Sequence, residues 1–155
     1  MMWNPLNLPP ETDRIAIIGP GRLGTAFAYK FGRENKKVII YYHDIDVCKS
    51  INREHLNPRH LTEDLAQRLG GMEIVPRLSP NVYATNDLER VVEENDFIFL
   101  SVTMDRLPEI LNRIEPLLRR KVTRTCFISA IKGLTAAETT RQLITPSQLI
   151  RSHFL

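Results

Sequence analysis

Arg14-Ile-Ala-Ile-Ile-Gly-Pro-Gly-Arg-Leu-Gly24 is the stretch that decides the fold of this chain. Its apolar run predicts a short buried strand, and a helix-forming segment follows the last glycine. The glycines between them have the spacing of a dinucleotide-binding turn. In such a turn Gly19 allows a tight bend, Gly21 lets the backbone approach a pyrophosphate, and Gly24 lets helix and strand pack closely. The helix N-terminus favours phosphate, because its first N–H groups lack partners within the helix.

The turn therefore predicts a binding site for the pyrophosphate of a dinucleotide. The site residues expected from it are Gly19, Pro20, Gly21, Arg22, Leu23 and Gly24. A glycine-rich turn without a ligand, which any α/β protein can contain, is the alternative interpretation.

The rest of the chain alternates strands with helices. Apolar runs predict further buried strands at 37–42, 82–85, 96–102 and 125–129, and helices are predicted at 45–53, 62–69, 87–94, from Asp105 onward and at 135–143. This alternation is typical of parallel sheets with βαβ crossovers. We predict an α/β fold, a Rossmann-type doubly wound parallel sheet in three layers, α/β/α, forming a single domain over 14–145. Residues 1–13, with three prolines, are expected to form a flexible leader.

The composition indicates an ordinary globular protein without a nucleic-acid or membrane partner. The net charge is +3, from 21 basic and 18 acidic side chains that are interleaved. The basic run Arg119-Arg-Lys121 follows a predicted helix, where cations complement the helix dipole. The sequence shows no signal peptide and no apolar run of membrane-spanning length. We therefore expect a cytoplasmic protein without a transmembrane segment.

Neither the cysteines nor the histidines predict a metal site. Cys48 and Cys126 have neither metal-ligand spacing nor the number needed for a disulfide framework. Cys126 lies in an apolar run and is expected in the core. His55, His60 and His153 share no ligand spacing with one another.

The end of the second predicted strand carries His43 and Asp44. Asp44 follows Gly24 by 20 residues, where an acidic side chain accepts hydrogen bonds from the adenosine ribose and disfavours a 2′-phosphate. His43 is a basic neighbour that is compatible with NADP. NAD is the expected cofactor and NADP the alternative. An aspartate that only caps a helix remains a further interpretation.

The ends of the fourth and fifth predicted strands lie at the edge of the sheet where ligands are expected. Val102 and Thr103 follow the fourth strand, and Lys132 follows the fifth. A cation at this edge binds an anionic substrate or polarises a carbonyl during hydride transfer. Lys132 is therefore the predicted substrate-side catalytic residue, with a solvated loop lysine as the competing interpretation. Asp105 is expected to cap a helix rather than act as a base.

Four stretches, in order, resemble the N-terminal domain of NAD-dependent glycerol-3-phosphate dehydrogenase. They are Gly19-Pro-Gly-Arg-Leu-Gly24, Ile51-Asn-Arg-Glu-His-Leu-Asn-Pro-Arg-His-Leu61, Ala84-Thr-Asn-Asp-Leu88 and Ser129-Ala-Ile-Lys-Gly-Leu134. The second is similar to the family's Ile-Asn-x-x-His-x-Asn-x-x-Tyr-Leu run, and the fourth to its Lys-Gly motif. The resemblance implies NAD binding along the glycine turn and around His43. It also implies an oxidoreductase of glycerol-3-phosphate metabolism, with Lys132 near a phosphorylated three-carbon substrate.

The chain departs from the family pattern in three places. Val102-Thr-Met-Asp105 stands where the family has a Val-Pro-Ser-Gln-like turn, and extra sequence separates Leu61 from Ala84. The chain ends at Leu155, and residues 146–155 lie where the family's helical substrate domain would begin. Because hydride transfer needs cofactor, polarising cation and proton donor held together, we expect cofactor binding without turnover. A stand-alone dinucleotide sensor or degenerate paralogue, and a short reductase completed as a homodimer, are the alternatives.

Overall fold

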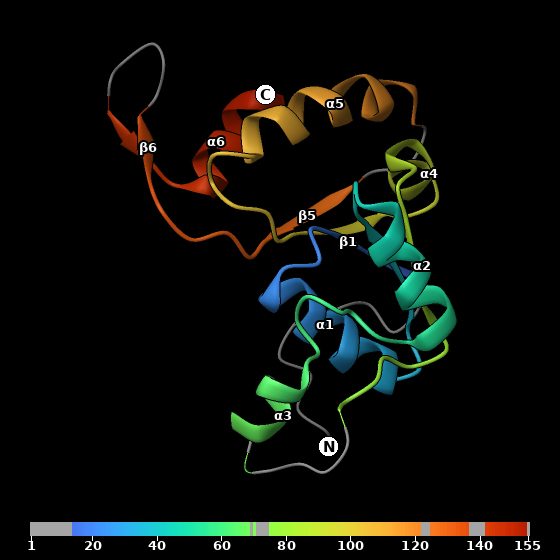
Figure 1. Cartoon of the computed structure of the whole chain (residues 1–155). Helices are drawn as coiled ribbons and strands as arrows, with labels where there is room; N and C mark the ends of the chain where they lie inside the picture. The colour runs from blue at the N-terminus through green and yellow to red at the C-terminus, as the bar shows by residue number, and fades with distance from the viewer. Residues whose placement is uncertain (1–13, 69, 71–74, 122–124, 137–141, 155) are drawn as a thin grey trace, which may run out of the picture.

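Five parallel strands form the central sheet of the molecule, in the order β3-β2-β1-β4-β5. The computed structural model in Figure 1 describes residues 14–68, 70, 75–121, 125–136 and 142–154. The strands are β1 (Arg14–Ile18), β2 (Lys37–Tyr41), β3 (Val82–Thr85), β4 (Phe97–Leu100) and β5 (Cys126–Ser129). In this order the chain builds outward from β1 through β2 to β3, then returns to the other side of β1 for β4 and β5.

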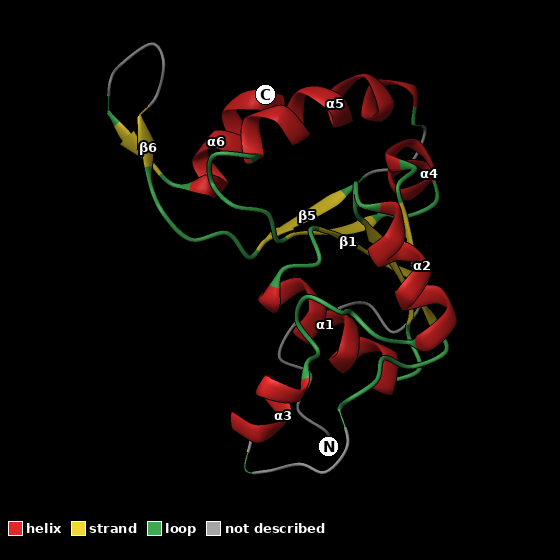
Figure 2. Ribbon diagram, in the orientation of Figure 1, coloured by secondary structure: helices red, strands yellow, loops and turns green. Residues whose placement is uncertain are grey.

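Helices cover both faces of the sheet, as Figure 2 shows. The helices α1 (Arg22–Arg33), α2 (Ile45–Glu54) and α3 (Glu63–Arg68) contribute to one apolar cluster or lie against it. The helices α4 (Leu88–Glu93), α5 (Leu107–Arg120) and α6 (Pro146–Phe154) belong to the cluster on the opposite face. The three-layer arrangement predicted from the sequence is confirmed.

Strand β1 shows how the sequence produces two cores. Ile15 and Ile17 pack into the cluster with α1 and α2, whereas Ala16 and Ile18 pack into the cluster with α4 and α5. All four side chains are fully buried. Successive residues of a strand face opposite sides, so a central parallel strand needs an unbroken apolar run.

Short polar side chains mark the helix starts. The Thr62 hydroxyl accepts from the Leu65 N–H at 3.3 Å, and Asp87 Oδ1 accepts from the Arg90 N–H at 3.0 Å. Helix α5 begins without such a cap, because the side chain of its N-cap residue Arg106 makes no capping hydrogen bond. The capping role expected for Asp105 is therefore wrong. Its carboxylate is instead hydrogen-bonded to Thr103, which lowers the pKa of Asp105.

The helix predicted at 135–143 is also wrong. The structure has a short antiparallel pair there, β6 (Thr135–Ala136) and β7 (Leu143–Ile144); residues 137–141 lie outside the described part of the chain. The pair stands away from the main sheet (Figure 1). Helices in proteins are stabilised chiefly by packing an amphipathic face, and the described apolar side chains at the two ends of this segment, Leu134 and Leu143, are exposed.

Two sequence predictions concern the edge of the sheet and the start of the chain. Cys126 is exposed rather than buried, because β5 is an edge strand paired with β4 alone among the described strands. The leader predicted at 1–13 lies outside the described residues. Residues 146–154 form α6, which packs on α5 through Ile150.

Candidate functional site

The glycine turn joins β1 to α1 with three glycines in different environments. Gly19 has φ +100°, and a Cβ added to it would lie 2.7 Å from the Ser101 carbonyl oxygen. A Cβ at Gly24 would lie 2.1 Å from the Gly19 carbonyl oxygen, so α1 approaches the turn as closely as a backbone allows. At Gly21 the nearest atom of the described residues, the same Ser101 oxygen, would be 4.0 Å away. Gly21 therefore leaves space beside the backbone, whereas Gly19 and Gly24 have no room for a side chain.

The N-terminus of α1 is free to receive an anion. Gly21 is its N-cap residue, no described side chain caps it, and its first turn contains no acidic residue. The first N–H groups of a helix carry partial positive charge when they have no acceptor. A phosphate group supplies the missing acceptors at such a position.

A cleft of about 530 Å³ opens directly on this turn. It lies where β1 separates from β4 and the chain reverses its direction across the sheet, which is where doubly wound folds bind ligands. It brings together the predicted residues Gly19, Pro20, Gly21, His43, Val102 and Thr103. The remaining lining residues are Ile18, Tyr41, Tyr42, His60, Ser101, Arg106, Glu109, Ile110 and Arg113.

Arg106, the N-cap residue of α5, and Arg113 within α5 bring two cations to the cleft that were not predicted from the sequence. Arg106 and Arg113 both line the cleft. Arg106 pairs with Glu109 at 3.1 Å, and the Arg113 guanidinium lies 5.5 Å from the centre of the Tyr41 ring. Their spacing of seven residues places both side chains on one face of a helix. Only the packing of α5 across the sheet turns that face towards the end of β2.

Asp44 lies outside the residues that line this cleft and is engaged elsewhere. Its Oδ1 accepts from the N–H groups of Asp46 at 3.1 Å and Val47 at 3.3 Å, which caps α2. Its Oδ2 pairs with the Arg59 guanidinium. The Val47 N–H, with the Asp46 N–H and Arg59, holds the pKa of Asp44 below its usual range. The carboxylate therefore stays charged at neutral pH, while its charge is offset locally.

Lys132 also lies outside the lining of the cleft. It is exposed in the segment that follows β5. A Cβ added to its neighbour Gly133 would lie 3.7 Å from Met104 Cβ, so the segment runs beside the loop after β4. Lys132 thus shares the carboxyl edge of the sheet with Val102 and Thr103 without joining them in one cleft.

Arg22 and Leu23 are exposed in the first turn of α1. Arg22 lines a neighbouring cleft of about 540 Å³ between α1 and α3. His60 lines both clefts. Burial lowers the pKa of His60, and Arg22 and Arg59 nearby lower it further.

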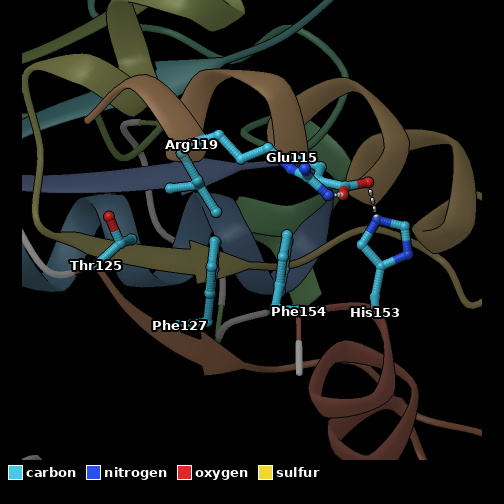
Figure 3. Close-up of a pocket in the computed structure, with 7 residues that line it drawn as sticks. Glu115, Arg119, Thr125, Phe127, His153 and Phe154 are labelled. Atoms are coloured by element: carbon cyan, nitrogen blue, oxygen red, sulfur yellow. Dashed lines mark hydrogen bonds and ion pairs between the residues drawn. The ribbon is translucent and has the colours of Figure 1, made fainter.

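A third hollow lies where α5, β5 and α6 meet (Figure 3). Side chains from α5, β5 and α6 line it, and His153 points from α6 towards Glu115, with Nε2 and Oε2 3.4 Å apart. None of the glycine-turn residues belongs to it. Across the part of the chain that the structure describes, no three His, Cys, Asp or Glu side chains are grouped to hold a metal ion. No described helix is long and apolar enough to cross a membrane.

Comparison with known sequences relates the chain to glycerol-3-phosphate dehydrogenases. Residues 14–153 match the family described as NAD-dependent glycerol-3-phosphate dehydrogenase N-terminus. A glycerol-3-phosphate dehydrogenase [NAD(P)+] of Halothermothrix orenii is 28% identical over 142 residues, which are 92% of this chain and 36% of that protein. One from Treponema denticola is 36% identical over 89 residues, 57% of this chain and 22% of that protein.

Solved structures share the fold. The glycerol-3-phosphate dehydrogenase of Coxiella burnetii superposes with a TM-score of 0.72 at 23% identity, over 94% of this chain and 38% of that one. The glycerol-3-phosphate dehydrogenase of Plasmodium falciparum superposes with a TM-score of 0.70 at 19% identity, over 90% of this chain and 37% of that one. The chain thus spans well under half the length of these relatives. With a family match over nearly all of its described residues, the chain belongs to the family of NAD-dependent glycerol-3-phosphate dehydrogenase N-terminal domains.

Proposed function

We propose that this chain binds NAD(H) at the glycine turn, as the cofactor domain of a glycerol-3-phosphate dehydrogenase. The observation that carries the proposal is the open position at Gly21, beside an uncapped helix N-terminus and at the mouth of a cleft of about 530 Å³. In that arrangement the N–H groups at the start of α1 bind the pyrophosphate. Arg106 and Arg113 add positive charge along the cleft.

When bound, the cofactor would supply or accept the hydride that interconverts glycerol 3-phosphate and dihydroxyacetone phosphate. The contribution of this chain is to hold the cofactor in the cleft, with His43 at the end of β2 and Val102 and Thr103 after β4. Lys132 would attract the phosphorylated substrate at the same edge. Lys132, the predicted substrate-side cation, does not join the residues that line the cleft. We therefore expect the chain by itself to bind cofactor without catalysing turnover, which is also the behaviour of a dinucleotide sensor.

NADP(H) is the second candidate cofactor, and the Arg59–Asp44 pair favours it. An acidic residue after β2 discriminates against a 2′-phosphate when its charge faces the ribose. Here Arg59 offsets that charge, and the arginine side chain is 54% exposed. A guanidinium in this place is a bidentate phosphate ligand once it turns from the carboxylate.

Calorimetric titration with NADH and NADPH tests both cofactor assignments. The wild-type chain is expected to bind NADH with micromolar-range affinity, and the absence of binding at millimolar cofactor would contradict the proposal. Gly21→Trp is expected to abolish binding, because the indole fills the space required by the pyrophosphate while φ at Gly21, −63°, suits any residue. Lys30→Trp, on an exposed part of α1, is the matched control.

Two further measurements separate the alternatives. Arg59→Gln is expected to weaken NADPH binding more than NADH binding; equal losses would remove Arg59 as a reader of the 2′-phosphate. The 155-residue chain is expected to give no NADH formation with glycerol 3-phosphate and NAD. Measurable turnover would show that the chain, alone or as a homodimer, already holds a complete catalytic site.

A further inference from the structure

We propose that Asn57 is a positioning residue that fixes the Pro20–Gly21 peptide in the orientation needed to bind the cofactor pyrophosphate. The inference rests on the proposed binding of NAD(H) at the glycine turn. Asn57 lies in the loop between α2 and α3, 37 residues from the peptide it holds.

A closed hydrogen-bond network connects Asn57 to the turn. Its Nδ2 donates to the Pro20 carbonyl oxygen at 3.0 Å and to Thr25 Oγ1 at 2.8 Å. The Thr25 hydroxyl donates in turn to the Pro20 carbonyl oxygen at 3.1 Å. Asn57 is 1% exposed and Thr25 is 2% exposed. Removing the partner of a buried polar group destabilises the folded chain. The network therefore holds these side chains in one geometry.

The anchored carbonyl determines where the next N–H points. The peptide between Pro20 and Gly21 is planar and trans, so its carbonyl and its N–H point in opposite directions. Because two donors hold the Pro20 oxygen towards the interior, the Gly21 N–H is directed away from Asn57. Pro20 and Gly21 both line the cleft. The network therefore aims the Gly21 N–H outward, where a phosphate oxygen can accept its hydrogen bond.

Asn57 also ties the turn to the following loop residues Arg59 and His60. Its Oδ1 accepts from the Arg59 N–H at 3.1 Å, and its carbonyl oxygen accepts from the N–H groups of His60 and Leu61. Arg59 pairs with Asp44, and His60 lines the cleft. One buried side chain thus sets the relative placement of the phosphate turn, Arg59 and His60.

Asn52 provides a matched control within the same run of sequence. Its Nδ2 donates to the Ala84 carbonyl oxygen at 2.9 Å, and its Oδ1 accepts from the Ala84 N–H at 2.7 Å. This pair connects α2 to β3 and involves no residue of the glycine turn. Asn52→Ala therefore removes two side-chain hydrogen bonds to backbone without touching the turn.

The test measures NADH affinity by calorimetry and thermal stability for both alanine variants. Asn57→Ala is expected to weaken NADH binding by about 5- to 100-fold, the range for removing one partner from a buried hydrogen-bond network. Asn52→Ala is expected to lower Tm while changing NADH affinity by less than about twofold. If Asn57→Ala binds NADH as wild type does, or if both variants lose affinity in proportion to their loss of Tm, the positioning role is refuted.

A second variant keeps the test decisive if Asn57→Ala does not fold. Thr25→Val preserves the shape of the side chain but removes its hydroxyl, leaving the Asn57–Pro20 bond in place. We expect a smaller loss of NADH affinity than in Asn57→Ala, and an unchanged affinity would contradict the network. Failure of wild-type protein to bind NADH would instead overturn the proposed function, so the two failures are distinguishable.

Discussion

At Gly24 an added Cβ would lie 2.1 Å from the Gly19 carbonyl oxygen, and at Gly21 the nearest atom of the described residues would be 4.0 Å away. The sequence pattern gives the two glycines different roles. Their neighbours give them opposite roles, since Gly24 allows helix packing and Gly21 leaves room for a ligand. Substitution should separate these roles.

Gly24→Ala is expected to destabilise the chain by ~1–3 kcal/mol, because the methyl group forces α1 away from the turn. The sign of this change in stability is informative, because replacing Gly by Ala inside a helix normally stabilises the protein by roughly 0.5–1 kcal/mol. Gly21→Ala should leave stability close to wild type. Urea unfolding measures both, and a stable Gly24→Ala variant would contradict the close approach.

Asp44 is expected to make stability fall at acidic pH. Its pKa is lowered in the folded chain, first by the Val47 N–H and then by the Asp46 N–H and Arg59. A carboxyl group with a depressed pKa contributes stability that is complete above its unfolded pKa, about 3.9, and is lost as pH falls through the folded pKa. Asp44→Asn keeps the capping oxygen but does not titrate. Its Tm should therefore fall less than that of wild type between pH 5 and pH 2, values on either side of that pKa of about 3.9.

Elements are predictable where a local signal and a buried face agree. The residues of β3, Val82–Thr85, were predicted without error, and the hydroxyl of Thr62, where a helix was predicted to begin, caps α3. Helix α6 begins with a reciprocal cap, in which Thr145 Oγ1 accepts from the Gln148 N–H and Gln148 Oε1 accepts from the Thr145 N–H. This pattern, with Pro146 next to the cap, is a recognised helix start. The ends of the segment 135–143 lack such an agreement, because they form the β6–β7 pair and Leu143 is exposed.

Ile150 is the anchor of α6, and its truncation should release that helix. The side chain is 9% exposed within the cluster shared with α5. Ile150→Ala is expected to cost ~2–4 kcal/mol, from lost apolar burial and the cavity left behind. Hydrogen exchange should show faster exchange of the α6 amides, with those of β1 unchanged. Ser147→Ala, at an exposed position of the same helix, is the control.

The whole molecule exposes large apolar side chains around the β6–β7 pair. Leu134 is 58% exposed and Leu143 is 69% exposed. Neighbouring exposed apolar side chains favour association, so the chain is expected to self-associate with rising concentration. Light scattering of wild type and of Leu143→Ser measures this, and the variant should stay monomeric at higher concentration. A wild-type chain that remains monomeric throughout would contradict the expectation.

The sequence by itself determined the features that depend on neighbours a few residues apart. These are the glycine turn, the apolar strands and their parallel orientation, and the family assignment through its short motifs. Tertiary structure decided which distant side chains meet. Arg106 and Arg113 reach the cleft only because α5 crosses the sheet, Arg59 offsets Asp44 across 15 residues, and Asn57 holds Pro20 across 37. Local spacing fixes backbone conformation, whereas contacts between elements depend on how buried faces pack together, which no short pattern encodes.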